Sequence, residues 1–280
     1  MVTNNYIADN ALWGIDFERA KATLRNNQLS NNSGALYFYD GNSGLLTPVE
    51  DIDRSNIVDG KPVYYWVNQQ NKSAPSDAGY VLLVNCNNIA VKGLSITSNG
   101  EKHNSNGIQL LDTSNVVIAG NVLTAGIGIS VNGFRKGSAN VSVFNNTLTT
   151  GLSISGQNSS AIGNSLRTKG IEMGSGVYVT GNSLSSCDVG IRLNGYNTLI
   201  FQNNITNVQP AYRFLKEAAI FYITTTSSAT PGRFTSNIMT LHNGLQTPTT
   251  NPPTTLGIKV IQLEATTGAT TRARMQMATA

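Results

Sequence analysis

The chain has 280 residues, which is enough for one large domain or two small ones. Only 12 % of the residues are charged, against an average of roughly 25 %, and asparagine is as frequent as all charged residues together. The formal net charge of +4, without any Lys/Arg-rich run, argues against a nucleic-acid partner, and the lack of a long apolar run argues against a membrane span.

A short motif, aliphatic-x-x-Asn-x-aliphatic, recurs along the chain. Its copies are VTNNYI (2–7), LRNNQL (24–29), IAGNVL (118–123), VFNNTL (143–148), AIGNSL (161–166), VTGNSL (179–184), IFQNNI (200–205) and FTSNIM (234–239). VKGLSI (91–96) has the same form with Leu94 in the asparagine position. The tightest copies are equally spaced at Asn146, Asn164 and Asn182, near the lower end of the roughly 20–50-residue periods of repeat proteins.

A second motif, Gly-aliphatic-x-aliphatic, alternates with the first. Its copies are GIDF (14–17), GIQL (107–110), GISV (128–131), GLSI (151–154), GIEM (170–173), GIRL (190–193) and GIKV (257–260), with GALY (34–37), GYVL (79–82) and AIFY (219–222) as looser forms. In both motifs apolar residues alternate with others over a few positions and the run ends at Gly or Asn, which is typical of short strands.

A repeat of two or three short strands cannot bury its apolar side alone, whereas stacked copies form one continuous core. We therefore predict an all-β fold, a single-stranded right-handed parallel β-helix (solenoid) of about nine to ten coils, with equivalent strands about 4.8 Å apart. Corner asparagines tolerate the left-handed backbone conformation and are expected to form a hydrogen-bonded ladder between coils. Glycines are expected to supply positive φ angles at other corners.

The β-helix is predicted to span residues 1–260. Residues 45–78 and 207–256 break the period, so we expect enlarged coils there, with DGKPVYYWV forming a strand or hairpin. For YRFLKEAAIFY (212–222) a strand is favoured over a helix. The Thr- and Ala-rich residues 261–280 predict a C-terminal cap or partner-binding arm.

The half-repeats occur together with the segment NIVDGKPVYYWV…PSDAGYVLLVNCNNIAVKGLSI. This combination resembles the NosD-like branch of the carbohydrate-binding and sugar-hydrolase (CASH) β-helix repeats, over about residues 1–206. The resemblance implies an exported or surface protein, mostly of a kind without demonstrated catalysis, and its founding group is linked to periplasmic copper-enzyme maturation. Two histidines, two distant cysteines and the Met275/Met277 pair make a poor copper site, so we predict no metal site and no cofactor.

Hydrolysis of a glycosidic bond needs two carboxyl groups roughly 5–9.5 Å apart. The rhythm NIAVKGLSI…NSNGIQLLDTSNVVIAGN…AGIGISV resembles the polygalacturonase-like β-helix hydrolases. At the positions that match the catalytic aspartates of that family, this chain has Ser105 or Asn106, then Gly126 and Ile127. None of these side chains transfers a proton as a carboxyl group does, so we predict no catalytic residue there.

The outward positions of the second motif place Glu172 and Arg192 on consecutive coils. We expect a cross-strand ion pair between them with a structural role, contributing roughly 0.2–1 kcal/mol. Cys86 and Cys187 are expected to face inward, several coils apart and beyond the reach of a disulfide.

A polar and aromatic group near the N-terminus is the candidate carbohydrate-binding site. Asp16 and Glu18 point outward on one strand, and Tyr37, Tyr39 and Asp40 follow in the next coil. Aromatic rings stack on the C–H faces of sugars while carboxylates accept hydrogen bonds from hydroxyls. The alternatives are an ordinary solvated strand face and an acid/base pair.

Tyr64 and Trp66 in KPVYYWV are further carbohydrate-binding candidates. Alternation along this strand predicts that one set of rings is buried and the other set is exposed. Part of this segment is therefore expected to belong to the core.

We expect a non-catalytic extracellular or cell-surface protein with a structural, adhesive or glycan-binding role. The alternatives are a polysaccharide hydrolase that uses Asp16, Glu18 and Asp40, and a self-assembling filament or viral fibre subunit. The expected partners are a glycan or polysaccharide and further copies of the chain, stacked head to tail on a repeat strand that begins at residue 2. Six N-x-[ST] sequons suit an exported protein, although no signal peptide precedes them here.

Overall fold

A computed structural model provides the coordinates, and it describes residues 1–18, 22–39, 50–97, 105–124, 127–132, 137–208, 212–214, 238–241 and 259–262. All regular structure in these residues is β-strand, in agreement with the predicted all-β class. Within the same part of the chain, no helix is long and apolar enough to span a membrane.

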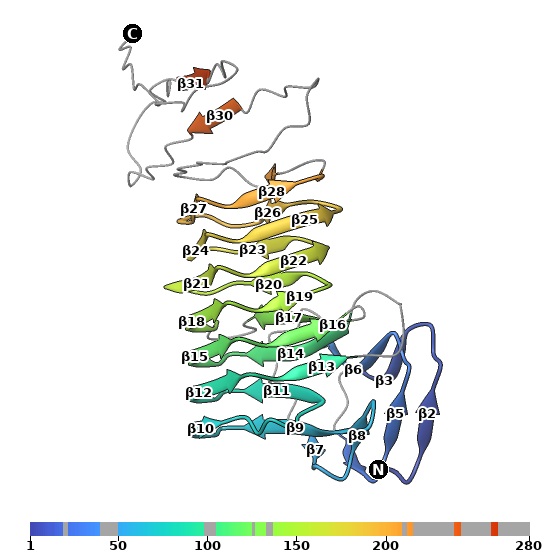
Figure 1. Cartoon of the computed structure of the whole chain (residues 1–280). Helices are drawn as coiled ribbons and strands as arrows, with labels where there is room; N and C mark the ends of the chain where they lie inside the picture. The colour runs from blue at the N-terminus through green and yellow to red at the C-terminus, as the bar shows by residue number, and fades with distance from the viewer. Residues whose placement is uncertain are drawn as a thin grey trace, which may run out of the picture.

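A parallel β-solenoid of about eight turns forms the main stack (Figure 1), as the repeats predict. Each complete coil gives one strand to each of three sheets. Within the main stack, the first sheet contains β9 (Lys61–Val67), β11 (Tyr80–Val84), β14 (Ser105–Leu111), β17 (Ile127–Asn132), β20 (Leu152–Ile154), β23 (Ile171–Met173), β26 (Ile191–Leu193) and β29 (Tyr212–Phe214). The second contains β10 (Gln70–Ser73), β12 (Asn87–Lys92), β15 (Ser114–Ala119), β18 (Ala139–Phe144), β21 (Ser159–Ile162), β24 (Val177–Thr180) and β27 (Leu199–Phe201). The third contains β13 (Ser95–Thr97), β16 (Val122–Thr124), β19 (Thr147–Leu148), β22 (Ser165–Thr168), β25 (Ser183–Cys187) and β28 (Asn204–Thr206).

The alternating residues of these strands point into one continuous core. Val116 and Ile118 on β15 lie in register with Val141 and Val143 on β18, and all four are buried. Burial of each such side chain contributes about 1.5–3 kcal/mol, which is why a stack is stable when a single coil is not. Cys86 and Cys187 are buried free thiols in this core, as expected.

Buried asparagines form the predicted ladder at one corner of the main stack. Asn121, Asn146, Asn164, Asn182 and Asn203 are at most 1 % exposed. Each of the first four donates its backbone N–H and its Nδ2 to the Oδ1 of the next, at 2.8–3.0 Å.

The sequence predicts the left-handed backbone conformation at the ladder asparagines themselves, and this prediction is wrong. It falls on the residue before each of them, which is Gly120, Asn145, Gly163, Gly181 or Gln202. In each pair, the first residue therefore makes the turn and the second residue forms the ladder hydrogen bonds.

The glycine of the second motif has a different role from the predicted one. A Cβ atom on Gly128 would lie 2.4 Å from the carbonyl oxygen of Gly151, and one on Gly170 would lie 1.8 Å from that of Gly190. These glycines are needed because consecutive coils approach closely at this corner, and they carry no positive φ.

Three N-terminal coils precede the main stack, and one strand of each belongs to the first sheet. Their strands are β1 (Val2–Thr3), β2 (Tyr6–Ala8), β3 (Trp13–Glu18), β4 (Thr23–Arg25), β5 (Gln28–Ser30), β6 (Gly34–Tyr39), β7 (Asp51–Ile52) and β8 (Ile57–Val58). β8 pairs antiparallel with β9 through Asp59 and Gly60, both at positive φ, which is the type I′ hairpin geometry. The predicted hairpin in DGKPVYYWV is thus confirmed.

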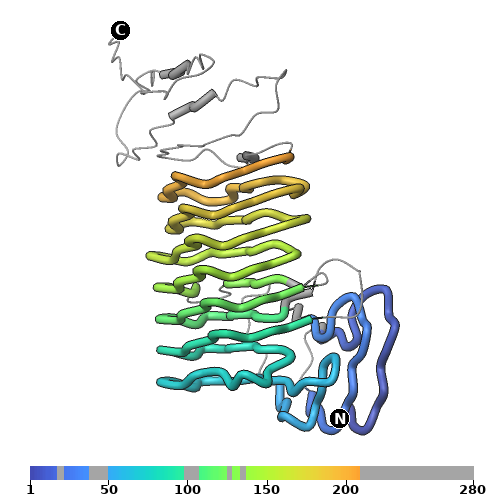
Figure 2. The backbone as a smooth tube through the Cα atoms, viewed as in Figure 1, coloured from blue at the N-terminus to red at the C-terminus, as the bar shows by residue number. Residues whose placement is uncertain are grey.

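The N-terminal coils lie beside the first coils of the main stack instead of continuing it (Figure 2). A second core fills the space between them. In it, Phe17 and Leu29 from the N-terminal coils pack with Tyr80, Leu82 and Val84 from β11. Both faces of β11 are therefore buried, and its sequence YVLLV shows no polar alternation for that reason. The predicted solenoid is confirmed, but its coils do not all lie in one line (Figure 2): about eight form the main stack, and the chain reverses at the β8–β9 hairpin that precedes them.

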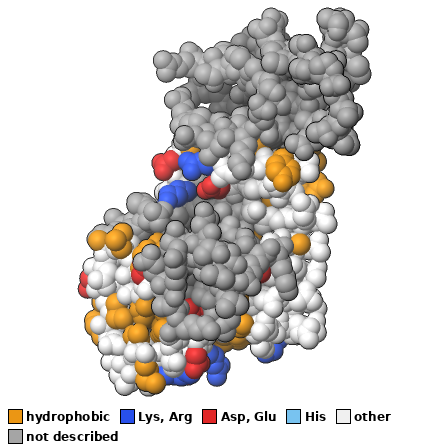
Figure 3. Space-filling view, turned by 180° about the vertical axis from the view of Figure 1, so that it is seen from behind, with side chains coloured by type: hydrophobic (Ala, Val, Ile, Leu, Met, Phe, Trp, Pro, Cys, Tyr) orange, Lys and Arg blue, Asp and Glu red, His pale blue; other side chains and the backbone are white. Residues whose placement is uncertain are grey.

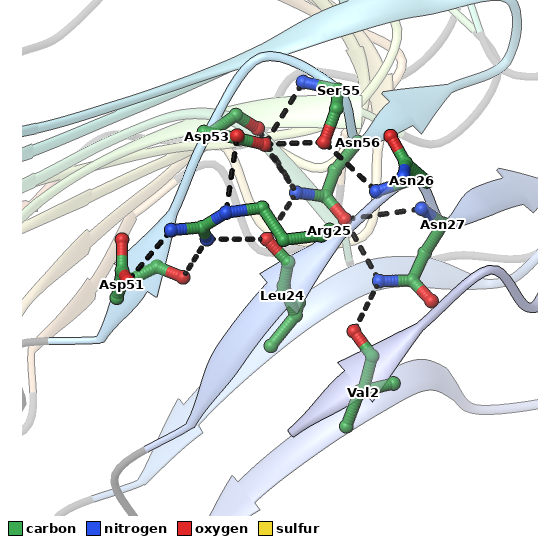
Figure 4. A network of polar contacts seen from close by, with 9 residues as sticks. All are labelled: Val2, Leu24, Arg25, Asn26, Asn27, Asp51, Asp53, Ser55 and Asn56. Atoms are coloured by element: carbon green, nitrogen blue, oxygen red, sulfur yellow. Dashed lines mark hydrogen bonds and ion pairs between the residues drawn. The ribbon is translucent and has the colours of Figure 1, made fainter.

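A polar network holds the second and third N-terminal coils together (Figure 4). Arg25 lies 2.6 Å from a carboxylate oxygen of Asp51 and 3.1 Å from one of Asp53, and its Nη1 donates to the Asp51 carbonyl. The hydrogen bond to Asp51 raises the pKa of the Arg25 guanidinium. The Nδ2 of Asn27 donates to the Oδ1 of Asn56 at 2.8 Å, so the N-terminal coils have an asparagine ladder like that of the main stack.

Near the C-terminus the structure describes β29 (Tyr212–Phe214), β30 (Ile238–Leu241) and β31 (Lys259–Gln262). β29 continues the main sheet at the start of YRFLKEAAIFY. The AIFY residues on which the strand prediction rests lie outside the described residues. β30 and β31 pair with each other in antiparallel orientation. Within the predicted enlarged coil at 207–256, the structure describes residues 207–208, β29 and β30. Residues 263–280 lie outside the described residues.

Candidate functional site

The predicted N-terminal site lies on the parallel pair β3–β6. Asp16 is in register with Tyr37, and Glu18 with Tyr39, so the two coils bring these positions side by side. Asp16 is exposed and Tyr37 is half-buried. The side chains of Glu18 and Tyr39, and all of Asp40, lie outside the described residues.

Trp13 belongs to this face, although the sequence analysis did not select it. Its ring stacks on the Tyr37 ring with centroids 4.4 Å apart and planes inclined by 12°. Gly34 makes the arrangement possible, because a Cβ there would lie 2.0 Å from the Trp13 ring. Alternation groups Trp13 with the inward Ile15 and Phe17, so only the glycine opposite it signals that the ring needs room.

Tyr64 and Trp66 lie in a different place, at the first coil of the main stack. Their rings meet edge to face at 6.1 Å, and both pack against the main core. Tyr64 is 3 % exposed and its hydroxyl donates to Asp77 at 2.8 Å, while Arg54 lies over its ring at 5.9 Å. The two predicted aromatic groups therefore do not form one site.

The opposite face of β9 is covered as well, so the expectation that one set of rings is exposed is wrong. Tyr65 packs against the second core, and its hydroxyl donates to the Glu50 carboxylate at 3.2 Å. Burial raises the pKa of Tyr65, and the nearby Glu50 raises it further. A pocket of about 470 Å³ lies beside these rings, lined by Asp53 and Arg54 among others.

A groove of about 290 Å³ crosses the outer side of four consecutive coils, where β17, β20, β23 and β26 begin. Gly128, Gly151 and Gly170 form part of its lining. Figure 3 shows acidic and basic side chains gathered on one face of the upper coils. The charged residues of the groove are Lys169, Glu172, Asp188 and Arg192.

Two kinds of position supply these charges. Glu172 and Arg192 are the outward residues of the second motif and lie in register, as predicted. Lys169 and Asp188 lie in the corners before β23 and β26, where the Asp188 N–H donates to the Thr168 carbonyl at 2.9 Å. The groove joins corner and strand positions that share no sequence register, which is why the sequence analysis missed it.

The expected ion pair is not formed. Among the described residues the ion pairs are those of Arg25, and Glu172 instead accepts a hydrogen bond from Nδ2 of Asn194. The Nε of Arg192 and the hydroxyl of Thr150 are buried and have no hydrogen-bond partner, and Thr150 is 4 % exposed. Both residues line the groove.

The polygalacturonase-like positions lie at the edge of this region. Ser105 is in register with Ile127 and Asn106 with Gly128, and β14 is irregular between Asn106 and Ile108. The backbone between Asn106 and Ile108 is thus irregular within the first sheet, next to the coil where the groove begins. Gly126 lies outside the described residues.

Comparison with known proteins gives no family for this chain: no family model matches it, and no curated protein matches its sequence.

Proposed function

We propose that this chain is a non-catalytic extracellular or cell-surface β-solenoid that binds glycans. The observation that carries this proposal is the stacked pair of Trp13 and Tyr37 beside the exposed Asp16. A ring pair offers an apolar surface to the C–H side of a sugar, and the carboxylate accepts hydrogen bonds from its hydroxyls.

The rigidity of this face supports binding. Trp13 is held over Gly34, and Phe17 on the same strand is anchored in the second core. Side chains that are already ordered lose little entropy when a ligand binds, so weak stacking contacts are sufficient. The NosD-like resemblance of the repeats is consistent with an exported glycan-binding protein.

Binding to an immobilised glycan panel tests the proposal. Trp13→Ala and Tyr37→Ala should each weaken binding by about tenfold or more, as expected for an aromatic residue at the centre of a contact. Tyr178→Ala is the control, because Tyr178 is an exposed tyrosine on β24, outside this face. Unchanged binding by Trp13→Ala would refute the role of this face, and binding to no glycan would refute the function.

Hydrolysis is the second candidate function, since Glu172 and Asp188 line one groove. Two carboxyl groups in a shared groove are the minimum for glycosidic cleavage. Release of reducing ends from neutral and acidic polysaccharides, abolished by Glu172→Gln and by Asp188→Asn, would establish it. Absence of turnover across the panel would favour binding alone.

A further inference from the structure

We infer that the groove across β17, β20, β23 and β26 binds a terminal sugar unit carrying a single carboxylate. This inference rests on the proposed glycan-binding function, but it concerns a second site on a different part of the molecule. Lys169, Glu172, Asp188 and Arg192 provide its charges.

Two buried groups in the groove have unmet hydrogen-bonding capacity. The Thr150 hydroxyl and the Arg192 Nε–H have no partner, although nearly all buried polar groups in folded proteins have one. A buried donor without an acceptor is unfavourable, so a ligand oxygen placed here gains more than it would at an exposed site. Thr150 and Arg192 both line the groove, so a ligand bound there lies against both residues.

A carboxylate is the ligand group that suits Arg192. The guanidinium presents Nε–H and a neighbouring Nη–H in one plane, and a carboxylate accepts both at once. Glu172 does not occupy this position, because it accepts from Asn194. Lys169 adds a second positive charge to the lining of the groove.

The remaining groups suit hydroxyls. Ionised Glu172 and Asp188 are acceptors only, and they match the hydroxyl donors of a sugar. The Thr150 hydroxyl can donate to a ring or hydroxyl oxygen. A ligand with one carboxylate and several hydroxyls therefore uses every polar group named here.

The balance of charge argues against a polyanionic chain. Two carboxylates and two cations line the groove, so a polymer with a carboxylate on every unit would place some of them beside Glu172 or Asp188. Like charges within a few ångströms repel by about 1 kcal/mol even in water, and by more in a groove. A single acidic unit at the end of a neutral chain avoids this repulsion.

The test compares trisaccharides that share a lactose base and differ in the terminal sugar: glucuronyl-lactose, sialyllactose and the neutral galactosyl-lactose. Ligand-detected NMR and calorimetry on the full chain should show that at least one acidic trisaccharide binds more tightly than the neutral one. The same acidic trisaccharide should also bind more tightly, per sugar unit, than trigalacturonate. Failure of both acidic probes to do so would overturn the inference.

Conservative variants locate the binding. Arg192→Lys keeps the charge but removes Nε–H, and it should weaken binding by roughly tenfold or more. Arg167→Lys is the matched control, because Arg167 is exposed on β22 and does not line the groove. Equal affinities for the two variants would also overturn the inference.

Thr150→Val gives a readout that is independent of folding defects. It replaces an unpartnered buried hydroxyl by a methyl group, so the free protein should melt at the same temperature or higher, while the affinity for the acidic probe falls. A variant that melts lower and binds normally would contradict the inference. Neutral glycans bound through Trp13 and Tyr37, with no effect of the groove variants, would sustain the proposed function alone.

Discussion

Substitution of Asn164 by alanine is the sharpest test of what holds the solenoid together. The Oδ1 of Asn164 accepts from the backbone N–H and the Nδ2 of Asn146 at 3.0 and 2.9 Å, and its Nδ2 donates to Val143 and to Asn182. Alanine removes all four hydrogen bonds from a site that is 1 % exposed. Water has no access to replace them.

The expected loss of unfolding free energy is about 2–4 kcal/mol. Each buried hydrogen bond contributes about 0.5–1.5 kcal/mol, and a group left unpaired costs about 1–3 kcal/mol. The loss falls short of the upper limit because Nδ2 of Asn146 also donates to Ile118 and Oδ1 of Asn182 still accepts the N–H at position 164. The main loss is the backbone N–H of Asn146.

Urea unfolding followed by circular dichroism measures this change as a shift in midpoint at constant slope. Asn204→Ala is the control, since Asn204 is an exposed asparagine on β28 and should change stability by no more than about 0.5 kcal/mol. Equal midpoints for the two variants would show that the ladder has a directing role without a stabilising one.

Two further predictions concern the second core and the buried thiols. Leu82→Ala should lower the free energy of unfolding by about 2–5 kcal/mol and speed amide exchange in β5, because Leu82 lies in the core that joins the N-terminal coils to the main stack. Ser153→Ala on β20 should have neither effect. Unchanged exchange in β5 would argue that the N-terminal coils and the main stack are not coupled. Burial raises the pKa of Cys187 to about 11, so alkylation of the folded protein should be slow at pH 8, accelerate as the pH approaches 11, and be rapid at pH 8 in urea. Rapid alkylation of folded protein at pH 8, read by mass spectrometry, would contradict that assignment.

The repeat itself was predictable because it follows from local chemistry. Alternation specifies short strands, and an asparagine after a residue that tolerates positive φ specifies a corner. The sequence shows the pair in Asn145-Asn146 and Gly163-Asn164, but it does not show which member turns the chain. That division depends on the next coil, because Oδ1 of Asn164 fixes the orientation of Asn146.

The reversal at the β8–β9 hairpin was only partly predictable. Asp59-Gly60 is a strong local hairpin signal, and a strand or hairpin is expected in the segment DGKPVYYWV. The unbroken apolar run of β11 indicates a strand buried on both faces, yet no pattern identifies the element that covers its outer face. That element is the β3–β6 layer with Leu36, whose carbonyl lies 3.5 Å from the Tyr80 hydroxyl, more than forty residues away in sequence.

The groove illustrates why a function is harder to read from a solenoid than its fold. Ladder asparagines are 18 residues apart from Asn146 to Asn164 and from Asn164 to Asn182, but 21 apart from Asn182 to Asn203. Of the three additional residues, one lies at the bulge in β25, one in the corner that carries Asp188 and one in the corner before β27, while the ladder bonds on either side keep the same geometry. Corners can therefore vary in length and charge without disturbing the stack, and a charged corner beside an outward strand residue makes a groove that neither shows alone. Lys169 and Asp188 come from corners, whereas Glu172 and Arg192 come from the repeating outward position of the strands, so the groove depends on both kinds of position.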